Sequence, residues 1–153
     1  MGNRHIIGIL ALASAACGTD PIKGEPLISG SVTGSYETGT YDIKFGLAAP
    51  YKGAFVVLLG SDAVNCSSIT APDPPGGDSA ALSLTALDVG HYANVDVNLI
   101  HNVGSFTGVG SNNGTVDITA SSAMSIAGSI AYTDTIDGKA YSLNGMFEVI
   151  RCN

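Results

Sequence analysis

Two histidines, His91 and His101, are the side chains in the body of the chain best suited to general acid–base chemistry. A serine hydrolase of the α/β type would carry its nucleophile in a Gly-x-Ser-x-Gly turn, and the sequence contains no such turn. A zinc hydrolase would need a His-Glu-x-x-His helix, which is also missing from the sequence. We therefore expect both histidines to be ordinary surface or rim residues. We predict that the protein is not an enzyme and has no catalytic residue.

Acidic residues near two loops are the candidates for a calcium site, because calcium binds about six to eight oxygens, often including loop carbonyls. Asp73 and Asp78 flank a Pro-Pro-Gly-Gly sequence, and Asp62 and Asn65 precede a cysteine. Their spacing differs from that of an EF-hand. We expect solvated loop residues here, with Asp73 and Asp78 as the weak metal candidates. We predict no bound metal and no cofactor.

A carbohydrate site would have to use tyrosine, because the chain has no tryptophan. Exposed aromatic rings supply the rigid contact area that such sites need. Most of the six tyrosines fall on alternating apolar positions, where packing in the core or at its rim explains them. Tyr51 and Tyr92 lie near predicted turns and are the two candidates for contact with a glycan.

The first sixteen residues have the composition of a secretory signal. Arg4 is followed by an apolar run over residues 6–13 and then by small residues at 14–16. The apolar run is about half of the roughly 20 residues that a helix needs to cross a bilayer. We therefore expect residues 1–16 to be a signal peptide that is removed.

The sequence Ser14-Ala15-Ala16-Cys17 resembles the lipobox of bacterial lipoproteins. This resemblance implies cleavage between Ala16 and Cys17, lipidation of Cys17, and the membrane as a partner through that lipid, since more than one acyl chain anchors durably. Glycine rather than aspartate follows the cysteine, which in enterobacteria-like sorting favours the outer membrane. Residues 17–26, with their prolines and glycines, would form the lipidated tether. The alternative is an ordinary secreted protein that is cut elsewhere.

Cys66 and Cys152 remain as a pair if Cys17 carries lipid. A disulfide between them would close a loop of 86 residue steps, worth about 4 to 5 kcal/mol in the chain-entropy estimate. Metal or redox chemistry is the competing explanation. It is disfavoured because the chain has no Cys-x-x-Cys and no histidine near either cysteine. We predict a Cys66–Cys152 disulfide in an exported protein.

Charge and composition limit the class of partner and of fold. Six Lys and Arg against 13 Asp and Glu give a net charge of −7, which argues against nucleic acid as a partner. A hydrophobic fraction of 45% is too high for a disordered chain, and 153 residues suit one domain. Low charge with 20 glycines and many Ser, Thr and Val residues favours strands over helices.

Alternation of apolar and polar residues with a period of two begins at Leu27 and predicts strands along the rest of the chain. The expected strands cover residues 28–36, 41–47, 54–59, 80–86, 92–101, 115–119, 124–133 and 140–151. The continuous apolar run at 54–59 predicts a central strand that is covered on both faces. Asp137-Gly138 supplies the positive φ that a tight hairpin needs.

Two segments without this alternation, residues 71–78 and 102–114, are predicted to be loops because they are rich in proline or in glycine and asparagine. About eight short strands without a helix indicate an all-β fold. We predict an antiparallel β-sandwich or a partly closed barrel over residues 27–153.

Several glycine-containing strand sequences, Ser29-Gly30-Ser31-Val32 and Leu143-Asn144-Gly145 among them, are similar to those of small uncharacterised bacterial β-rich lipoproteins, of the kind abundant in myxobacteria. The resemblance covers most of the chain after the signal and implies a fold without catalytic residues. We expect a non-enzymatic, lipid-anchored envelope protein of structural or binding role, with an unknown protein or glycan partner. The alternative is an envelope hydrolase or calcium-dependent carbohydrate-binding module that uses loops 71–78 and 102–114. The sequence does not indicate an oligomeric state.

Overall fold

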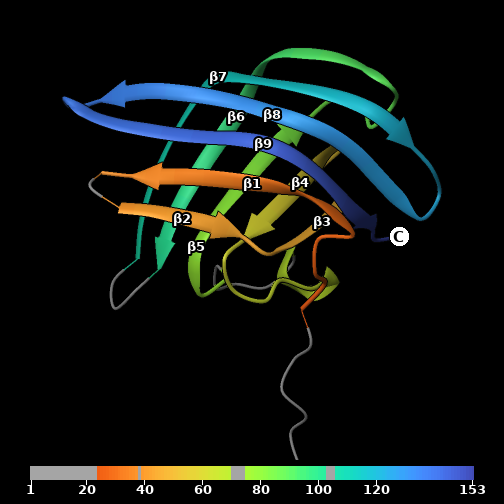
Figure 1. The fold of residues 1–153 in the computed structure, drawn as a ribbon. Coiled ribbons are helices and arrows are strands. Elements are labelled where there is room, and N and C mark those ends of the chain that lie inside the picture. Colours follow the sequence, from red (N-terminus) through yellow and green to blue (C-terminus); the bar gives the residue numbers. More distant parts are fainter. Residues whose placement is uncertain (1–23, 38, 70–74, 103–105) are drawn as a thin grey trace, which may run out of the picture.

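The computed structural model describes residues 24–37, 39–69, 75–102 and 106–153 (Figure 1). Within these ranges the chain forms nine strands and one short 3-10 helix, η1 (Cys66–Ile69). The strands are β1 (Ser29–Tyr36), β2 (Gly39–Ile43), β3 (Phe45–Tyr51), β4 (Ala54–Gly60), β5 (Gly77–Leu84), β6 (Gly90–Asn102), β7 (Phe106–Ser121), β8 (Ser125–Ile136) and β9 (Lys139–Arg151). The predicted all-β fold is confirmed, with nine strands where about eight were expected.

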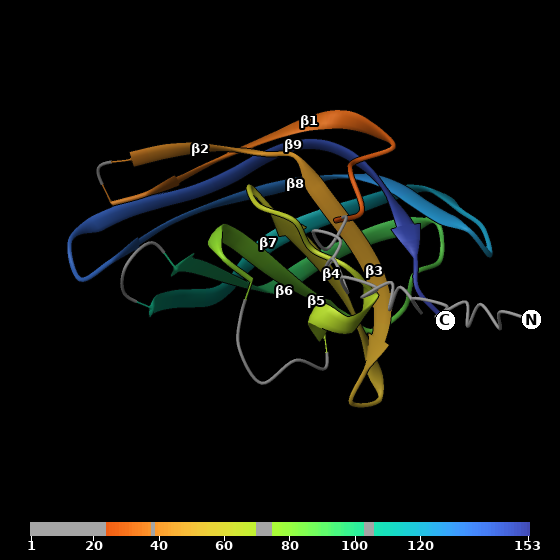
Figure 2. The same cartoon turned by 90° about the horizontal axis from the view of Figure 1, so that it is seen from below.

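The nine strands form one sheet in the order β2-β1-β9-β3-β4-β5-β6-β7-β8, and β8 also pairs with β9. This last pairing closes seven strands into a barrel, with β1 and β2 added along β9. Figure 2 shows two layers: β1, β2, β8 and β9 lie on one side, and β4 to β7 cross beneath them. Partial closure of the sheet was expected, and the pairing of β8 with β9 makes it a closed ring.

Strand β9 is the junction of the fold because it pairs with three other strands. It pairs with β8 over residues 139–150 and with β1 over residues 141–148. Its end pairs in parallel with β3 at Ile150 and Arg151. Between β2 and β3 the chain turns a corner at Lys44, whose N–H donates to the carbonyl of Gly60 at 3.0 Å.

Two apolar clusters lie on opposite faces of the sheet. The larger cluster fills the barrel interior and includes residues of all the strands from β1 to β9. The smaller one lies outside the barrel and contains Leu47, Ala49, Leu58, Val64 and Cys152. Strand β4 contributes Val57 and Leu59 to the first cluster and Leu58 to the second. The prediction that this apolar strand is covered on both faces is therefore confirmed.

The disulfide predicted from the cysteine count is present between Cys66 and Cys152, whose Cα atoms are 5.7 Å apart. It ties η1 to the end of β9 beside the outer cluster. The first described residues lie next to it, because the Glu25 N–H donates to the carbonyl of Val64 at 2.6 Å and Pro26 forms a bridge with Phe45. The last part of the expected tether is thus bound to the barrel.

The prediction of a loop over residues 102–114 is wrong. β6 extends to Asn102, and β7 begins at Phe106 and pairs with it. Glycine has a packing role there: a Cβ on Gly110 would lie 2.3 Å from the Asn98 side-chain oxygen, and one on Gly114 would lie 2.4 Å from a Val97 methyl. These glycines permit close strand contact instead of breaking the strand.

The predicted loop at residues 71–78 is also too long, since β5 already begins at Gly77. Asp78 is therefore a strand residue, whereas Asp73 lies outside the described residues, as do Ala16 and Cys17. The hairpin at Asp137-Gly138 is confirmed, with φ of 52° and 76° at the two positions. In the ranges that the structure describes, no helix has the length and apolar character needed to span a membrane.

Candidate functional site

Asp78 and His101 lie opposite each other on β5 and β6, where they form the registered pair of the two strands. Both lie on the strand faces that point into the barrel. Asp78 is two residues before Ala80 of the inner cluster on β5, and His101 is two residues after Leu99 of that cluster on β6. The His101 Nδ1 is 2.5 Å from the Asp78 Oδ1, so that a proton on Nδ1 is donated to the carboxylate. The pair stays accessible, with 36% of the His101 side chain and 19% of the Asp78 side chain exposed.

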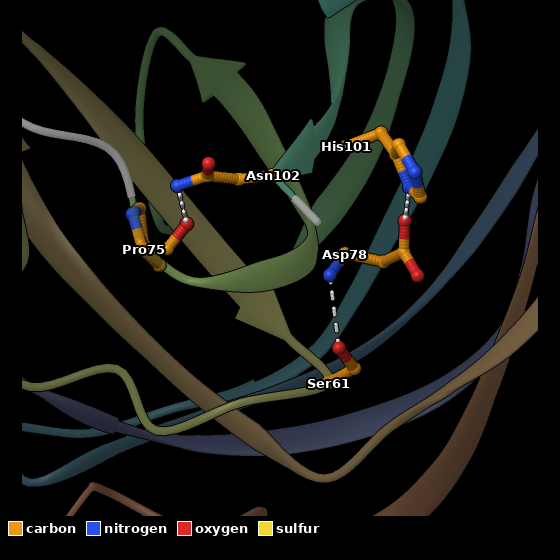
Figure 3. A network of polar contacts seen from close by, with 5 residues as sticks. All are labelled: Ser61, Pro75, Asp78, His101 and Asn102. Atoms are coloured by element: carbon orange, nitrogen blue, oxygen red, sulfur yellow. Dashed lines mark hydrogen bonds and ion pairs between the residues drawn. The ribbon is translucent and has the colours of Figure 1, made fainter. Parts of the chain in front are cut away.

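Neighbouring polar contacts hold this pair in place (Figure 3). The Asp78 N–H donates to the Ser61 Oγ at 3.0 Å, which fixes the start of β5 against the end of β4. The Asn102 side-chain amide donates to the carbonyl of Pro75 at 3.1 Å. The contact with Ser61 therefore fixes the backbone of Asp78, and the contact with His101 fixes the orientation of its side chain.

Tyr36, the last residue of β1, stacks on the His101 ring with centroids 5.2 Å apart and an interplanar angle of 21°. The same tyrosine meets the edge of Tyr141 of β9, again with centroids 5.2 Å apart. Aromatic pairs with these separations are in the attractive range. The contacts connect the β1–β2 hairpin in one layer to β6 in the other, across the end of the barrel.

Tyr41 of β2 is 8% exposed, and its hydroxyl has no hydrogen-bond partner in the described part of the chain. Burial first, and then the negative charge of Asp78, raise the pKa of Tyr41 above its usual range, so the phenol stays neutral. Tyr36 and Tyr132 have smaller effects of the same sign on that pKa. The end of the Tyr41 ring packs over Gly34 of β1, where a Cβ would lie 2.4 Å from the Tyr41 Cζ.

We call this set of side chains the tyrosine mouth. It consists of Tyr36, Tyr41, Asp78, His101, Tyr132 and Tyr141. The histidine and Asp78 were singled out in the sequence as separate weak candidates, and the structure brings them together. The tyrosines were assigned to packing in the core or at its rim, and Tyr41, Tyr132 and Tyr141 are indeed buried in the inner cluster.

Replacing Tyr41 by phenylalanine is expected to leave the folded state as stable as before or about 0.5 to 1 kcal/mol more stable. The substitution removes a buried hydroxyl that makes no protein hydrogen bond and leaves the ring in place. Urea unfolding monitored by circular dichroism measures this change. A fall of more than 1 kcal/mol in the free energy of unfolding would show that the hydroxyl makes a hydrogen bond, contrary to the structure.

The second histidine, His91, lies elsewhere and pairs with Asp117 across β6 and β7, with its Nδ1 2.6 Å from the Asp117 Oδ1. Both side chains are exposed, at 64% and 50%. A register shift near Asn94, which has a φ of 56°, separates His91 from the inward-facing part of β6. In the described ranges neither histidine has a hydroxyl or thiol hydrogen-bond partner, so no nucleophile–base pair is assembled.

Of the remaining calcium candidates, Asp62 lies beside the start of β5, where a Cβ on Gly77 would be 2.8 Å from its Oδ2. Asn65 forms a local turn, accepting from the Ser67 N–H at 3.0 Å through its side-chain oxygen. No group of three or more His, Cys, Asp or Glu side chains suited to a metal ion occurs among the described residues. Asp73 lies outside them. The hydrolase and calcium-dependent alternatives stay untested predictions.

The two tyrosines proposed for glycan contact lie apart from the tyrosine mouth. Tyr51 is 41% exposed at the β3–β4 turn, where the Lys52 ammonium lies 5.0 Å from its ring centre. The Tyr92 hydroxyl donates to the carbonyl of Asp88 at 2.8 Å. An open depression of about 570 Å³ also exists beside β1, β8 and β9, and it is lined by Ser35, Thr133, Asp134, Thr135, Ala140, Tyr141 and Ser142.

No protein family, curated protein or solved structure matches the chain at a significant level. The class to which the molecule belongs is therefore defined by its fold and site alone. It is an all-β barrel protein with a disulfide-braced outer cluster and an aromatic, acidic end.

Proposed function

We propose that the protein is a non-enzymatic, lipid-anchored protein of the bacterial cell envelope, with a barrel domain that has a binding role. The Cys66–Cys152 disulfide is the observation that carries this proposal. Disulfides form and persist in exported proteins and are rare in reducing compartments. With these two cysteines paired, Cys17 is the one left for lipid in a segment with the composition of a signal peptide.

The position of the first described residues agrees with an anchor that precedes the barrel. Gly24 lies against Ala63 and Phe45 beside the outer cluster, so a Cβ at this glycine would be 2.6 Å from Ala63. The chain therefore enters the domain at one fixed corner, next to the disulfide-linked η1. A lipid on Cys17 would hold that corner toward the membrane, through only a few intervening residues.

Lipidation is tested by expressing the full chain in a bacterium fed with labelled palmitate. We expect label on the wild-type protein, and no label with a larger precursor for Cys17→Ser. Globomycin, which blocks the lipoprotein signal peptidase, should cause the same precursor to accumulate in the wild type.

The matched control is the double variant Cys66→Ser with Cys152→Ser, which removes the other two cysteines and should keep the label. Wild-type protein that is processed normally in globomycin and carries no label would overturn the anchor and leave ordinary secretion.

A further inference from the structure

We propose that the tip of the β3–β4 hairpin, residues 50–53, lies in the headgroup layer of the membrane that carries the lipid on Cys17. This inference rests on the proposed anchor and adds to it the surface with which the barrel faces the bilayer. Its basis is an exposed hairpin tip without acidic residues, on the same face of β3 that contacts the first described residue.

The hairpin tip combines apolar, aromatic and cationic side chains. Pro50, Tyr51, Lys52 and Gly53 are all exposed, and the Lys52 ammonium lies 5.0 Å from the centre of the Tyr51 ring. A tyrosine ring has an apolar body and a polar hydroxyl, and lysine carries its charge on a long apolar stem. Tyrosine is enriched at membrane interfaces, and lysine near them directs its ammonium to the headgroups. The hairpin tip therefore has the composition of an interfacial contact.

The backbone holds the hairpin tip in one shape. Tyr51 and Ala54 are the last registered pair of the hairpin, and Lys52 and Gly53 between them have φ of 49° and 82°. Positive φ at both positions is the conformation of a tight two-residue turn. Apart from the chain neighbours of Gly53, no atom of the described residues lies within 4 Å of a Cβ position on this glycine. Figure 2 shows the hairpin extending past the other labelled strands at the lower edge of the view.

The charge of the hairpin is opposite in sign to that of the whole chain. Residues 45–60 contain none of the 13 acidic residues, and their one charged residue is Lys52, whereas the net charge of the chain is −7. The Arg151 guanidinium lies 6.0 Å from the centre of an aromatic ring of the same hairpin. Glu25 and Asp62 lie at the opposite end of the hairpin, where β3 begins and β4 ends. Anionic headgroups attract Lys and Arg side chains near the surface, which favours contact through the tip.

The chain enters the domain on the same face of β3 to which Tyr51 belongs. A Cβ on Gly24, the first described residue, would lie 2.9 Å from the Phe45 ring. Leu47 and Ala49 of the outer cluster come next on this face, and Tyr51 follows them at the same spacing of two residues. At about 3.3 Å per residue, the strand places Phe45 and Tyr51 roughly 20 Å apart.

The length of chain before Gly24 makes the membrane the occupant of this face. Seven residue steps separate Cys17 from Gly24. A lipid on Cys17 therefore lies within about 25 Å of Gly24. This reach exceeds the roughly 20 Å between the two ends of β3, so the lipid surface and the hairpin tip can meet. Contact at both ends would place the outer face of β3 toward the bilayer.

The test follows a single tryptophan at the hairpin tip. The chain from Cys17 onward, which holds every residue of the described barrel, is coupled through the Cys17 thiol to a maleimide phospholipid in vesicles of phosphatidylcholine and phosphatidylglycerol. Cys66 and Cys152 do not react because they are paired. The protein has no tryptophan, so Tyr51→Trp introduces the only one. With bromines on shallow acyl carbons we expect a blue shift and an about twofold loss of fluorescence, because interfacial rings lie at that depth.

Met146→Trp is the matched control, because Met146 is 68% exposed on the outer face of β9, in the layer formed with β1 and β8. Its fluorescence should be the same with and without bromine. In the Tyr51→Trp background, Lys52→Gln should lower the equilibrium constant for contact about fivefold, because it removes one cation from the tip. Lys139→Gln, which neutralises an exposed lysine next to the β8–β9 turn, should leave it unchanged.

Equal quenching at positions 51 and 146, or no quenching at position 51, would overturn the proposal. An emission shift at position 51 that occurs on self-association or on adding a glycan, and not with vesicles, would assign the tip to those partners and overturn the lipid contact. Palmitate labelling tests the anchor in the cell, whereas bromine quenching tests the tip on a chemically attached chain. The proposed anchor and this inference therefore fail separately.

Discussion

Replacing Cys66 and Cys152 together by alanine is expected to lower the free energy of unfolding by about 4 to 5 kcal/mol. The bond closes a loop of 86 residue steps, so its loss releases much conformational freedom in the unfolded chain. For a domain of this size the corresponding fall in Tm is roughly 10 to 20 °C. Calorimetry of the oxidised wild type and of the double variant measures both quantities.

The location of the disulfide adds a local effect to this global one. Cys152 is buried in the outer cluster with Val64, and the Cys152 N–H donates to the carbonyl of Ala48 at 2.8 Å. Without the bond, η1 and the adjoining segment should detach from β3 before the barrel unfolds. Hydrogen exchange should then rise first at Glu25, whose N–H is bonded to Val64.

Cys17→Ser is the control for this prediction, because it removes a cysteine outside the described domain. It should leave Tm unchanged within about 1 °C. Reduction of the wild type should reproduce the double variant. A double variant that melts within a few degrees of the wild type would mean that the unfolded chain gains little freedom from opening this loop.

Strand identity was predictable from the sequence wherever one face of a strand is buried. The alternation in β8 and β9 marks their inner faces clearly, and the apolar run of β4 marked a strand covered on both sides. Asp137-Gly138 fixed the turn between β8 and β9 through its need for positive φ. These signals are local, and each follows from burial or backbone sterics.

The glycine-rich start of β7 was not predictable in this way. Composition alone predicts that Gly110 and Gly114 break a strand, but both are required by the close approach of β6. That approach depends on a partner strand and on bulges near Asn94, which no local pattern specifies. The tyrosine mouth was missed for the same reason, because Tyr36 meets His101 only after the β1–β2 hairpin crosses the barrel end.

Gly145→Ala is expected to destabilise the protein by about 3 to 5 kcal/mol, the combined cost of backbone strain and overpacking. Gly145 has a φ of 144°, and a Cβ there would lie 2.1 Å from the Ser31 carbonyl oxygen and 2.7 Å from the Val32 Cα. These are backbone atoms of β1, the strand that pairs with β9 at this point. The clashes of an added Cβ with these atoms can be relieved only by moving β1 away from β9.

Gly53→Ala separates conformational strain from steric contact. Gly53 also has a positive φ, of 82°, but no atom lies within 4 Å of its Cβ position. This control should cost only about 1 to 2 kcal/mol, the price of a left-handed backbone with a side chain. Denaturant unfolding of both variants gives the difference directly.

Because β1 ends in Tyr36, displacement of β1 by Gly145→Ala should also shift the His101 ring signal, which Gly53→Ala should leave in place. Equal destabilisation by the two changes would show that β1 and β9 are not held as closely as the structure has them.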